Sequence, residues 1–510
     1  MNKKYLLAHD VGTGGTKAVI TDLQGRILQT AYRSHHLYYP QEGWVEQKPE
    51  ELWNAYVSTT WEIYSQAGID PDEIMGLGVS AQMFNLLPVD DNCNPLINMI
   101  SWLDVRSVKQ ADRIMDGDIP EFLFRKTGNI PTAKDIIPKI LWLRDVRPEI
   151  WERTSKLLDC KEYIIYRLTG KIAIDWHGAS VYFLFDPYEK KWSEPVCRRL
   201  GIPVAKLPKT YPSTFIIEEI TDKASELTGL KRDTPVVLCA GDVAAAQTGS
   251  GSNRDGKVHL CIGTATWIGI SSSRFQNNPE KPFWALNHIH PEKWVIAGEM
   301  ETGGGALMWF KDAFCKNELK RAKEEGISVY ELISRMAAEI EPGSNKLLFA
   351  PWLSGERAPV LDHYARGAFV GLSLSHNKSH LARAVMEGVA YQLRWISESM
   401  QNIGHRINEV NAIGGGSTSD ILAQIISDIT GYPLNIVEYP LEAGAIGAAL
   451  TVAVAMGTYS SVDSIDDLIC IQKKIEPGRE NKNRYDDLYE DFREMYTALV
   501  PVYRRLHKSR

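Results

Sequence analysis

The sequence has few of the features that mark disulfide-stapled, nucleic-acid-binding or membrane-spanning proteins. Its seven cysteines are odd in number and scattered, with no Cys-x-x-Cys pair, so we expect neither a disulfide framework nor a structural zinc site. A net charge of −7 leaves no dense Lys/Arg face for nucleic acid. The longest apolar stretch, residues 443–457, is short and rich in Ala and Gly, which predicts a buried helix and no membrane span.

The start of the chain also lacks the pattern of a secretory leader. The apolar stretch before His9 and Asp10 is too short for one, and together with the cysteine usage this predicts a cytoplasmic protein. Of the 510 residues, 44% are hydrophobic and 24% are charged. These values are ordinary for a globular chain of two or three domains.

What the sequence does contain is a glycine-rich turn close to its start. An apolar segment ending at Asp10 is followed by this turn and by a second apolar segment, which predicts strand, tight turn and strand. Glycines let a backbone approach an anion closely, and successive N–H groups form a concave phosphate seat. Because a carboxylate beside phosphates needs a divalent cation between them, we predict a magnesium–nucleotide site with Asp10 as a metal ligand. The turn consists of Gly12, Thr13, Gly14, Gly15, Thr16 and Lys17.

This turn matches neither of the two familiar glycine-rich nucleotide motifs. No Gly-Lys-Ser/Thr closes it as in a P-loop, and its glycines lead into a strand rather than a helix. Taken alone, it could be a hairpin whose glycines only satisfy turn geometry. A second occurrence favours the phosphate site, since Gly263 and Thr264 again lie between two apolar strands. Two such turns, one in each half, predict two similar domains that face each other across a nucleotide.

The organisation of the rest of the chain follows from breaks between apolar segments. Residues 249–256 are rich in Gly and Ser and lie near the midpoint, which makes them the clearest linker. We therefore predict an N-terminal domain over 1–250, a C-terminal domain over 256–460 and a helical extension over 461–510. Strands are expected at 26–32, 73–80, 236–240 and 410–413, and helices at 53–66, 381–400 and 485–499.

A further glycine cluster follows the strand expected at 410–413. Gly414, Gly415, Gly416 and Ser417 open a helix there, and glycines at the start of a helix predict a nucleotide contact. The alternative is a βα turn in which the glycines only allow close packing.

In their order and spacing, these segments resemble the FGGY carbohydrate kinases, and the resemblance spans nearly the whole chain. It implies an α/β fold of two actin- and hexokinase-like (ribonuclease H-like) domains around a nucleotide-binding cleft, with ATP and Mg²⁺ as cofactors. The matching segments are 10–17, 43–47, 241–242, 263–264, 353–359 with 365–369, 414–417 and 442–447.

Within the family, four segments look most like xylulokinases. The sequence departs from that group at Phe84 and Val243, where His and Asn are usual. Both departures replace groups expected to bind sugar hydroxyls, and an apolar lining discriminates poorly between hydroxylated substrates. We predict a pentulose such as D-xylulose as the acceptor, with another ketose, a polyol or an autoinducer-like sugar derivative as alternatives. The xylulokinase-like segments are 79–83, 127–129, 138–143 and 166–170.

The resemblance also implies roles for single residues. Asp242 is expected to be the general base and to lie at the metal with Asp10, the alternative being that Asp242 only caps a helix. Lys17 is expected at the phosphates, although it could instead frame the turn. Asp104 and Arg106 could form a structural ion pair rather than bind sugar. The predicted sugar contacts are Gln82, Met83, Phe84, Trp102, Asp104, Arg106 and Asp242.

Two other classes of protein remain open at this point. One is a nucleotide-driven clamp ATPase without a sugar, which residues 353–359 disfavour. The other is a catalytically silent sugar sensor, which Asp242 and the two phosphate-type turns disfavour. The expected partner is a small-molecule sugar, with a homodimer as one assembly to consider.

Overall fold

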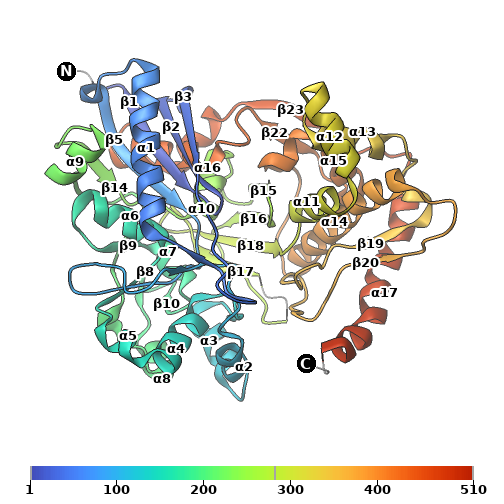
Figure 1. Ribbon diagram of the computed structural model, residues 1–510, viewed down its shortest axis with the longest axis horizontal. Coiled ribbons are helices and arrows are strands. Elements are labelled where there is room, and N and C mark those ends of the chain that lie inside the picture. Colours follow the sequence, from blue (N-terminus) through green and yellow to red (C-terminus); the bar gives the residue numbers. More distant parts are fainter. Residues whose placement is uncertain (1–2, 281–282, 508–510) are drawn as a thin grey trace.

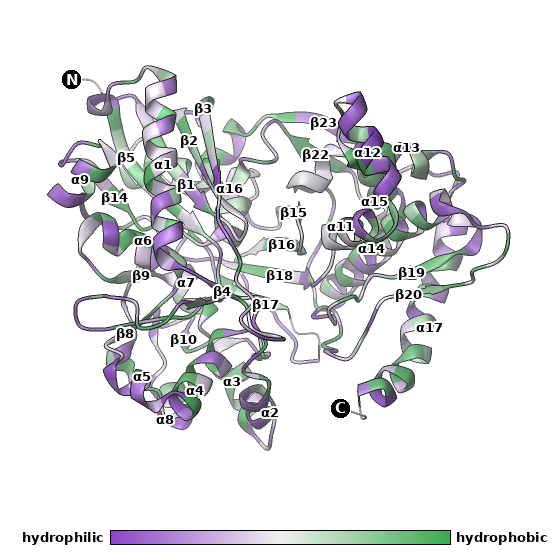
Figure 2. Cartoon of the chain, viewed as in Figure 1, coloured by the Kyte–Doolittle hydropathy of each residue, from purple (hydrophilic) through white to green (hydrophobic). Residues whose placement is uncertain are grey.

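The computed structural model describes residues 3–280 and 283–507 and consists of two lobes (Figure 1). The N-terminal half, blue to green in Figure 1, and the C-terminal half, yellow to red, each surround a central sheet. Hydrophobic residues concentrate in the strands of both sheets, whereas outer helices such as α12 (Lys316–Glu325) are hydrophilic (Figure 2). Each lobe therefore has a core of its own.

The first sheet has the strand order β13-β14-β5-β1-β2-β3. Strands β1, β2 and β3 form an antiparallel meander, whereas β5 and β14 run parallel to β1. Leu6, Leu7 and Ala8 of the central strand β1 are fully buried, as expected for a strand that is covered on both faces. The strands are β1 Tyr5–Val11, β2 Gly15–Asp22, β3 Ile27–Ser34, β5 Ile74–Ala81, β13 Ile216–Glu219 and β14 Pro235–Val237.

The second sheet repeats this plan, with the order β17-β18-β16-β15-β21-β22-β23. Strands β15, β16 and β18 are antiparallel, and β21 and β22 run parallel to β15. The order β3-β2-β1-β5-β14 thus recurs as β18-β16-β15-β21-β22, which confirms the predicted pair of ribonuclease H-like domains. The strands are β15 Val258–Ile262, β16 Thr266–Ser272, β17 Trp284–Asn287, β18 Trp294–Met300, β21 Val410–Ile413, β22 Leu434–Val437 and β23 Ile471–Ile475.

Helices cover both sheets, and the helices expected at 53–66, 381–400 and 485–499 are present as α1, α14 and α17. The helices are α1 Pro49–Ala67, α2 Val108–Ile114, α3 Ile119–Thr127, α4 Ile136–Val146, α5 Pro148–Arg153, α6 Cys160–Thr169, α7 Trp176–Val181, α8 Glu194–Leu200, α9 Asp222–Thr228, α10 Asp242–Gly249, α11 Gly304–Phe314, α13 Val329–Ala338, α14 Lys378–Asn402, α15 Asp420–Thr430, α16 Ala443–Ala455 and α17 Lys482–His507. Short strands are β4 Glu46–Gln47, β6 Leu87–Val89, β7 Met99–Ile100, β8 Lys156–Leu158, β9 Ala173–Asp175, β10 Phe185–Asp186, β11 Lys191–Trp192, β12 Lys209–Tyr211, β19 Leu348–Ala350 and β20 Ala368–Val370. Within residues 3–280 and 283–507, each helix is too short or too polar to cross a membrane.

Two helices join the lobes. Helix α16 follows β22 of the second sheet, yet it packs on β1, β2 and β5 of the first sheet and against α10. The two helices approach so closely that a Cβ on Gly249 would overlap the carbonyl of Ala443, and a Cβ on Gly447 would overlap the carbonyl of Ala245. Small residues are therefore required in α16, the helix predicted over residues 443–457, where it crosses α10.

We expect Gly447→Ala to lower the free energy of unfolding by about 3 kcal/mol, at the upper end of the range for overpacking. The added methyl group meets backbone atoms of α10, which cannot rotate away as a flexible side chain could. Thermal unfolding measures the effect, with Gly14→Ala as the control because a Cβ there has no neighbour within 4 Å. Equal melting temperatures for the two variants would contradict the close crossing.

The connection at 249–256 differs from the flexible linker that its composition predicts. Gly249 ends α10, and Ser250, Ser252 and Asn253 are fully buried. The Asn253 side-chain amide donates to Asp466 at 2.6 Å, and its backbone N–H donates to the same carboxylate at 3.1 Å. The glycine and serine residues here allow close packing. Residues 249–253 are therefore an ordered part of the junction between the lobes.

The segment expected as a helical extension over 461–510 also contributes to the second sheet through its described residues, 461–507. Strand β23 pairs with β22, and a short 3₁₀ segment, Val462–Leu468, supplies Asp466 to the connection described above. Helix α17 places Tyr485, Tyr489 and Phe492 in the core of the second lobe.

Candidate functional site

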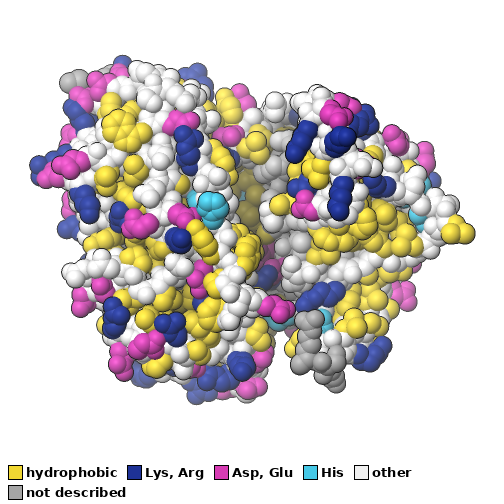
Figure 3. Space-filling model, in the orientation of Figure 1, with side chains coloured by type: hydrophobic (Ala, Val, Ile, Leu, Met, Phe, Trp, Pro, Cys, Tyr) yellow, Lys and Arg dark blue, Asp and Glu magenta, His cyan; other side chains and the backbone are white. Residues whose placement is uncertain are grey.

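A hollow separates the two lobes on the face shown in Figure 3. The β1–β2 turn of the first sheet is closed by a hydrogen bond from Gly12 N to Gly15 O at 3.0 Å. Gly15 packs so tightly against the ring of Tyr32 that a Cβ would overlap it. Gly15 and Thr16 are buried, whereas Gly12, Thr13 and Gly14 are at least partly exposed, so these three residues are the part of the turn that a ligand can reach.

Trp102 and Gln47 anchor this turn to the rest of the first lobe. Trp102 donates its Nε1–H to the Thr13 hydroxyl at 2.8 Å, and Gln47 donates its Nε2–H to the Thr13 carbonyl at 2.9 Å. Gln82, a predicted sugar contact, in turn donates to Gln47 Oε1 at 2.6 Å. The predicted phosphate and sugar residues therefore belong to one connected network.

The second turn, between β15 and β16, is supported by a glycine cluster that the sequence analysis missed. Gly304 N donates to Gly263 O and Gly305 N donates to Thr264 O, both at 2.9 Å. A Cβ on Gly304 would overlap the carbonyl of Gly263. Residues 303–305 thus bring the start of α11 directly onto the second turn. These glycines lie between a strand and a helix, which is the same pattern that predicted a nucleotide contact at residues 414–417.

The cluster at 414–417 lies beside the same turn. Gly414 has a φ of +82°, and its Cβ would lie 2.8 Å from the carbonyl oxygen of Ile262, the residue before Gly263. The cluster forms a 3₁₀ turn, Gly415–Thr418, whereas α15 begins only at Asp420 with Ser419 as its cap. The predicted helix start is therefore shifted by a few residues, because the serine hydroxyl satisfies the first free N–H groups.

Two carboxyl groups lie close enough to interact at the junction of the lobes, where the Asp10 carboxylate lies against Gly444 at the start of α16. Asp242 is the first residue of α10, and Asp10 lies on β1; both are half-buried. Burial, and then the charge of Asp10, raises the pKa of Asp242 to about 8. Burial also raises the pKa of Asp10, and its Oδ1 atom has no hydrogen-bond partner among the described residues. A half-buried pair of carboxyl groups with like charge and one unpaired oxygen favours a cation between or beside them.

The residues present fit a hard divalent cation that is shared with a phosphate. Within the described ranges, no group of three or more His, Cys, Asp or Glu residues forms a complete protein-only metal site. Mg²⁺ typically takes one or two carboxylates and completes its shell with water and substrate phosphates. Asp10 and Asp242 supply that number of carboxylates.

Lys17 connects the two halves of the chain. Its ammonium donates to the Leu441 carbonyl and lies 3.9 Å from Glu442 Oε1, just before α16. The lysine is thus engaged at the junction of β2 with α16, and its predicted contact with the phosphates stays a prediction.

The predicted sugar loop follows β5 and is held in an unusual backbone conformation. Phe84 has a φ of 64°, which is costly for a bulky residue. Its carbonyl accepts a hydrogen bond from the buried Lys139 ammonium at 2.7 Å. Its ring stacks on Trp284 from the second half, with centroids 4.9 Å apart. The loop is therefore positioned by contacts from both halves.

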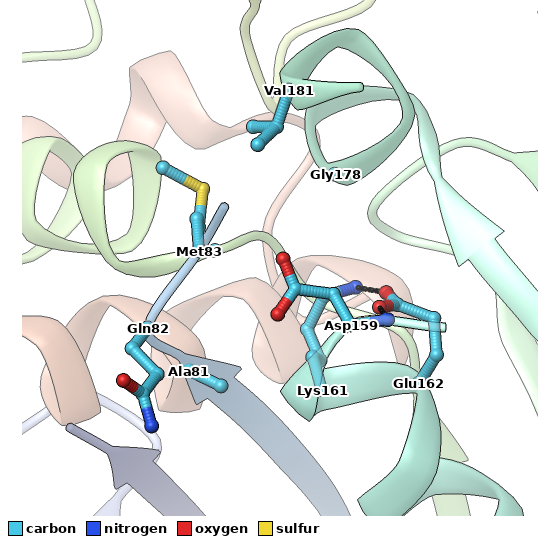
Figure 4. A pocket seen from close by; sticks show the side chains of 9 residues that line it. Ala81, Gln82, Met83, Asp159, Lys161, Glu162, Gly178 and Val181 are labelled. Carbon is cyan, nitrogen blue, oxygen red and sulfur yellow. Dashed lines mark hydrogen bonds and ion pairs between the residues drawn. The ribbon is translucent and has the colours of Figure 1, made fainter. Parts of the chain in front are cut away.

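Met83, Phe84 and Val243 belong to one hydrophobic cluster, as expected for an apolar wall. Met83 packs on Gly241, directly before Asp242, where a Cβ would overlap its sulfur. Behind Met83 lies a cavity of about 10 Å³, which is room for roughly one water molecule. Figure 4 shows the Asp159 carboxyl between Met83 and the Lys161–Glu162 ion pair.

Asp104 and Arg106 are placed inside the first lobe. Arg106 Nε donates to Asp104 Oδ1 at 2.9 Å, and its Nη2 lies 2.8 Å from Glu46 Oε1. Trp44 stacks under the guanidinium at 3.7 Å. Asp104 also accepts the Val45 N–H at 2.6 Å. Both charges are satisfied within the lobe, an arrangement that supports the structural ion pair rather than a sugar contact.

Two neighbouring residues of the second sheet, Cys261 and Trp267, lie on the face toward these carboxyl groups, and no sequence motif singled them out. Cys261 occupies the position in the second hairpin that Asp10 occupies in the first, two residues before the glycine. Burial, and then the carboxylates of Asp242 and Asp10, raise the pKa of its thiol. Trp267 pairs with Cys261 across the strands. Cys261 and Trp267 each follow or precede a buried core residue, Leu260 and Ile268, along their strands. This alternation could have shown that they lie on the opposite face of the sheet.

Comparison with known proteins identifies the family. The chain matches the N-terminal domain of the FGGY family of carbohydrate kinases over residues 5–249 and its C-terminal domain over residues 258–456. The chain belongs to this family, as the motifs predicted, and is an ATP-dependent sugar kinase.

Its relatives act on more than one kind of substrate. A gluconokinase from Bacillus subtilis is 30% identical over 508 residues, covering 99% of this chain and 96% of the relative. A xylulose kinase from Staphylococcus epidermidis is also 30% identical over 509 residues, covering 99% and 98%. The crystal structure of a xylulose kinase from Lactobacillus acidophilus superposes with a TM-score of 0.88 at 25% identity, covering 99% of this chain and 100% of that one. The crystal structure of a gluconate kinase from the same organism has the same TM-score and identity, covering 99% of each chain. These similarities leave the particular sugar open.

Proposed function

We propose that this kinase transfers the γ-phosphoryl group of ATP to a hydroxyl of a pentulose such as D-xylulose, with Asp242 as the general base. The observation that carries this proposal is the placement of Asp242 beside Asp10, in a hollow that also receives the two glycine turns. Phosphoryl transfer depends on holding charged oxygens in line, so positioning and electrostatics supply most of the catalysis.

In this proposal, each group has a separate task. The two glycine turns contact the phosphates through Thr13 and Gly14 in the first and Gly263–Thr264 in the second, supported by the glycines at 303–305. Asp242 accepts the proton of the sugar hydroxyl as that oxygen attacks phosphorus. Asp10, with Asp242 nearby, would hold Mg²⁺, which would supply neutralisation of the phosphate charge. Residues 414–417 lie where they can contact the adenosine, and closing of the lobes excludes water.

The test of this proposal is ADP release with a panel of acceptors. D-xylulose and other pentuloses are compared with D-gluconate and glycerol at equal concentrations. D-gluconate is the second candidate, because the gluconokinase relative is as similar as the xylulose kinase. We expect a pentulose to raise ADP release above the acceptor-free rate. If only D-gluconate does so, the substrate is a sugar acid and the pentulose proposal is wrong.

The apolar wall makes a further prediction about the acceptor. Leaving a substrate hydroxyl unpaired against Phe84 or Val243 costs about 1–3 kcal/mol. For each lost contact, kcat/KM for D-xylulose should therefore be about 10- to 100-fold lower than in an enzyme with His and Asn there. The double substitution Phe84→His with Val243→Asn should raise it.

Phe183→His is the control, because Phe183 contacts the Phe84 ring edge-on at 5.9 Å but lies outside the predicted contacts. It should not raise kcat/KM. A native kcat/KM for D-xylulose near about 10⁵ M⁻¹s⁻¹ or above would show that the apolar pair does not weaken this substrate.

A further inference from the structure

Gln47 lies between the first glycine turn and the sugar loop, residues 82–85, and it carries none of the predicted phosphate, sugar or metal contacts. It ends the short strand β4 and pairs there with Met99 of β7. Gln47 is only 1% exposed. Because buried polar groups are nearly always paired, its carboxamide depends on protein groups for its hydrogen bonds.

The carboxamide of Gln47 is engaged at both of its ends. Nε2 donates to the Thr13 carbonyl at 2.9 Å and lies 3.2 Å from His35 Nδ1, and Oε1 accepts from Gln82 at 2.6 Å. Burial lowers the pKa of His35 to about 4, so the neutral ring can accept at Nδ1. The reversed carboxamide would place an oxygen against the Thr13 carbonyl and an amino group against that of Gln82. The partners therefore fix its orientation.

The hydrogen bond to Thr13 sets the direction of one peptide in the turn. In a trans peptide the carbonyl and the following N–H point in opposite directions, so the Gly14 N–H points away from Gln47. Gly14 is exposed, and a Cβ there would have no neighbour within 4 Å. The Gly14 carbonyl accepts from the Tyr32 hydroxyl and from the His35 N–H, both at 3.2 Å. The carbonyls of the turn are thus held by the protein, and its open side is left to a ligand.

A second set of hydrogen bonds joins the same turn to the sugar loop. Trp102 donates its Nε1–H to the Thr13 hydroxyl at 2.8 Å, and its backbone N–H donates to Asn85 Oδ1 at 3.0 Å. Asn85 Nδ2 donates to the Gln82 carbonyl at 3.2 Å. Together with the bonds of Gln47, these bonds close a ring between the turn and the loop. A shift of the sugar loop therefore changes the bonds that hold Thr13.

We propose that Gln47 is a positioning residue that holds the Thr13–Gly14 peptide with its N–H toward the phosphates of the nucleotide and couples this peptide to the sugar loop. The inference rests on the proposed phosphate contact of the first turn and deepens it by naming a residue that acts through the turn. Without Gln47, the peptide can rotate and present the Thr13 carbonyl oxygen to the phosphates, which repel it. An acceptor that orders the sugar loop also orders the ring, so nucleotide and acceptor bind cooperatively.

The experiment compares two nucleotides that differ in their phosphates. Calorimetry with Mg²⁺ present measures the affinity of the full chain for AMP and for a non-hydrolysable analogue of ATP. Gln47→Met keeps the length of the side chain but has neither donor nor acceptor for this ring. It should weaken the ATP analogue by about 10- to 100-fold, as expected for a lost hydrogen bond to a charged group. The affinity for AMP should be unchanged.

Coupling to the acceptor is measured with the same two proteins. The acceptor is the compound that gives the most ADP release among the pentuloses, D-gluconate and glycerol. At saturation it should raise the affinity of the native protein for the ATP analogue by about 5-fold or more, and Gln47→Met should lack this gain. Gln47→Glu at alkaline pH keeps an oxygen for Gln82 but has no donor for Thr13. It should show the same two losses.

A matched control separates this role from a contribution to stability. Gln392 is also fully buried, donates to the Ala358 carbonyl at 2.7 Å and accepts from Trp352 at 2.9 Å. Both partners belong to the core of the second lobe. Gln392→Met should leave the two nucleotide affinities and the acceptor effect unchanged, even if the melting temperature falls.

Three results would overturn the inference. One is native affinity for the ATP analogue in both Gln47→Met and Gln47→Glu. Another is an equal loss of affinity for AMP and for the ATP analogue, which would make Gln47 a residue of stability only. The third is an acceptor effect of the same size, or none, in the native protein and both variants. Absence of ADP release with every acceptor would contradict the proposed function, whereas the two nucleotide affinities would still test the role of Gln47.

Discussion

Asp242→Asn is expected to lower kcat by about 10²–10⁴-fold, the usual loss when a general base is removed. Asparagine keeps the shape of the side chain but cannot take the proton of the sugar hydroxyl. ATP affinity should be retained, because the phosphates are held by the glycine turns. Steady-state ADP release and nucleotide binding by calorimetry measure the two effects. A variant that keeps half of the native rate on the best acceptor would rule out this assignment.

The pH profile gives an independent readout of the same residue. Since the pKa of Asp242 is raised to about 8, the ionised base forms only as the pH rises toward that value. In the native enzyme, kcat/KM should therefore fall as the pH is lowered below about 8, and Asp242→Asn should lack this limb. Asp222→Asn is the matched control, because Asp222 is also the first residue of a helix, α9, but is exposed.

Asp10→Asn is expected to lower kcat/KM by about 100-fold and to raise the Mg²⁺ concentration needed for half-maximal rate. Metal stabilisation of developing charge is worth several kcal/mol, and each 1.4 kcal/mol is about tenfold in rate. The amide of asparagine is neutral, so the variant loses the carboxylate charge to which the unpaired Oδ1 atom belongs. Titration of Mg²⁺ at fixed ATP measures the shift.

The Asp10 variant also has a signature of its own. Because the charge of Asp10 raises the pKa of Asp242, its removal should move the acidic limb of the pH profile to lower pH. Asp22→Asn at the other end of the same hairpin serves as the control; its carboxylate accepts N–H groups of the turn at Gln24 and Arg26. An unchanged Mg²⁺ requirement in Asp10→Asn would exclude this carboxylate as a metal ligand.

Local patterns in the sequence were sufficient to predict the fold and the two glycine turns. Apolar strands on either side of Gly12–Gly15 and of Gly263–Thr264 define hairpins through contacts between near neighbours in the chain. The recurrence of that hairpin was enough to predict two related sheets. The Ala- and Gly-rich composition of residues 443–457 was enough to predict a buried helix, since small residues permit close packing.

Contacts between distant parts of the chain were decided only by the tertiary structure. The sequence could not show that α16 packs on the first sheet, that Lys17 reaches Leu441, or that residues 249–253 are fixed rather than flexible. Asp104 and Arg106 have the residue types of a sugar site, yet Glu46 and Trp44 satisfy the arginine within the lobe. Whether a charged side chain binds substrate or a neighbour depends on which groups surround it, and residue type alone does not determine those groups.

The sequence by itself determined the class of protein, the two-domain fold and the glycine turns, because each of these depends on short-range patterns and their order along the chain. The tertiary structure alone decided which side chains meet across the lobes: Trp284 with Phe84, Arg357 with Asp135, and Lys134 with Glu301. These pairs join residues far apart in the sequence, and they become neighbours only when the two lobes come together around helices α10 and α16.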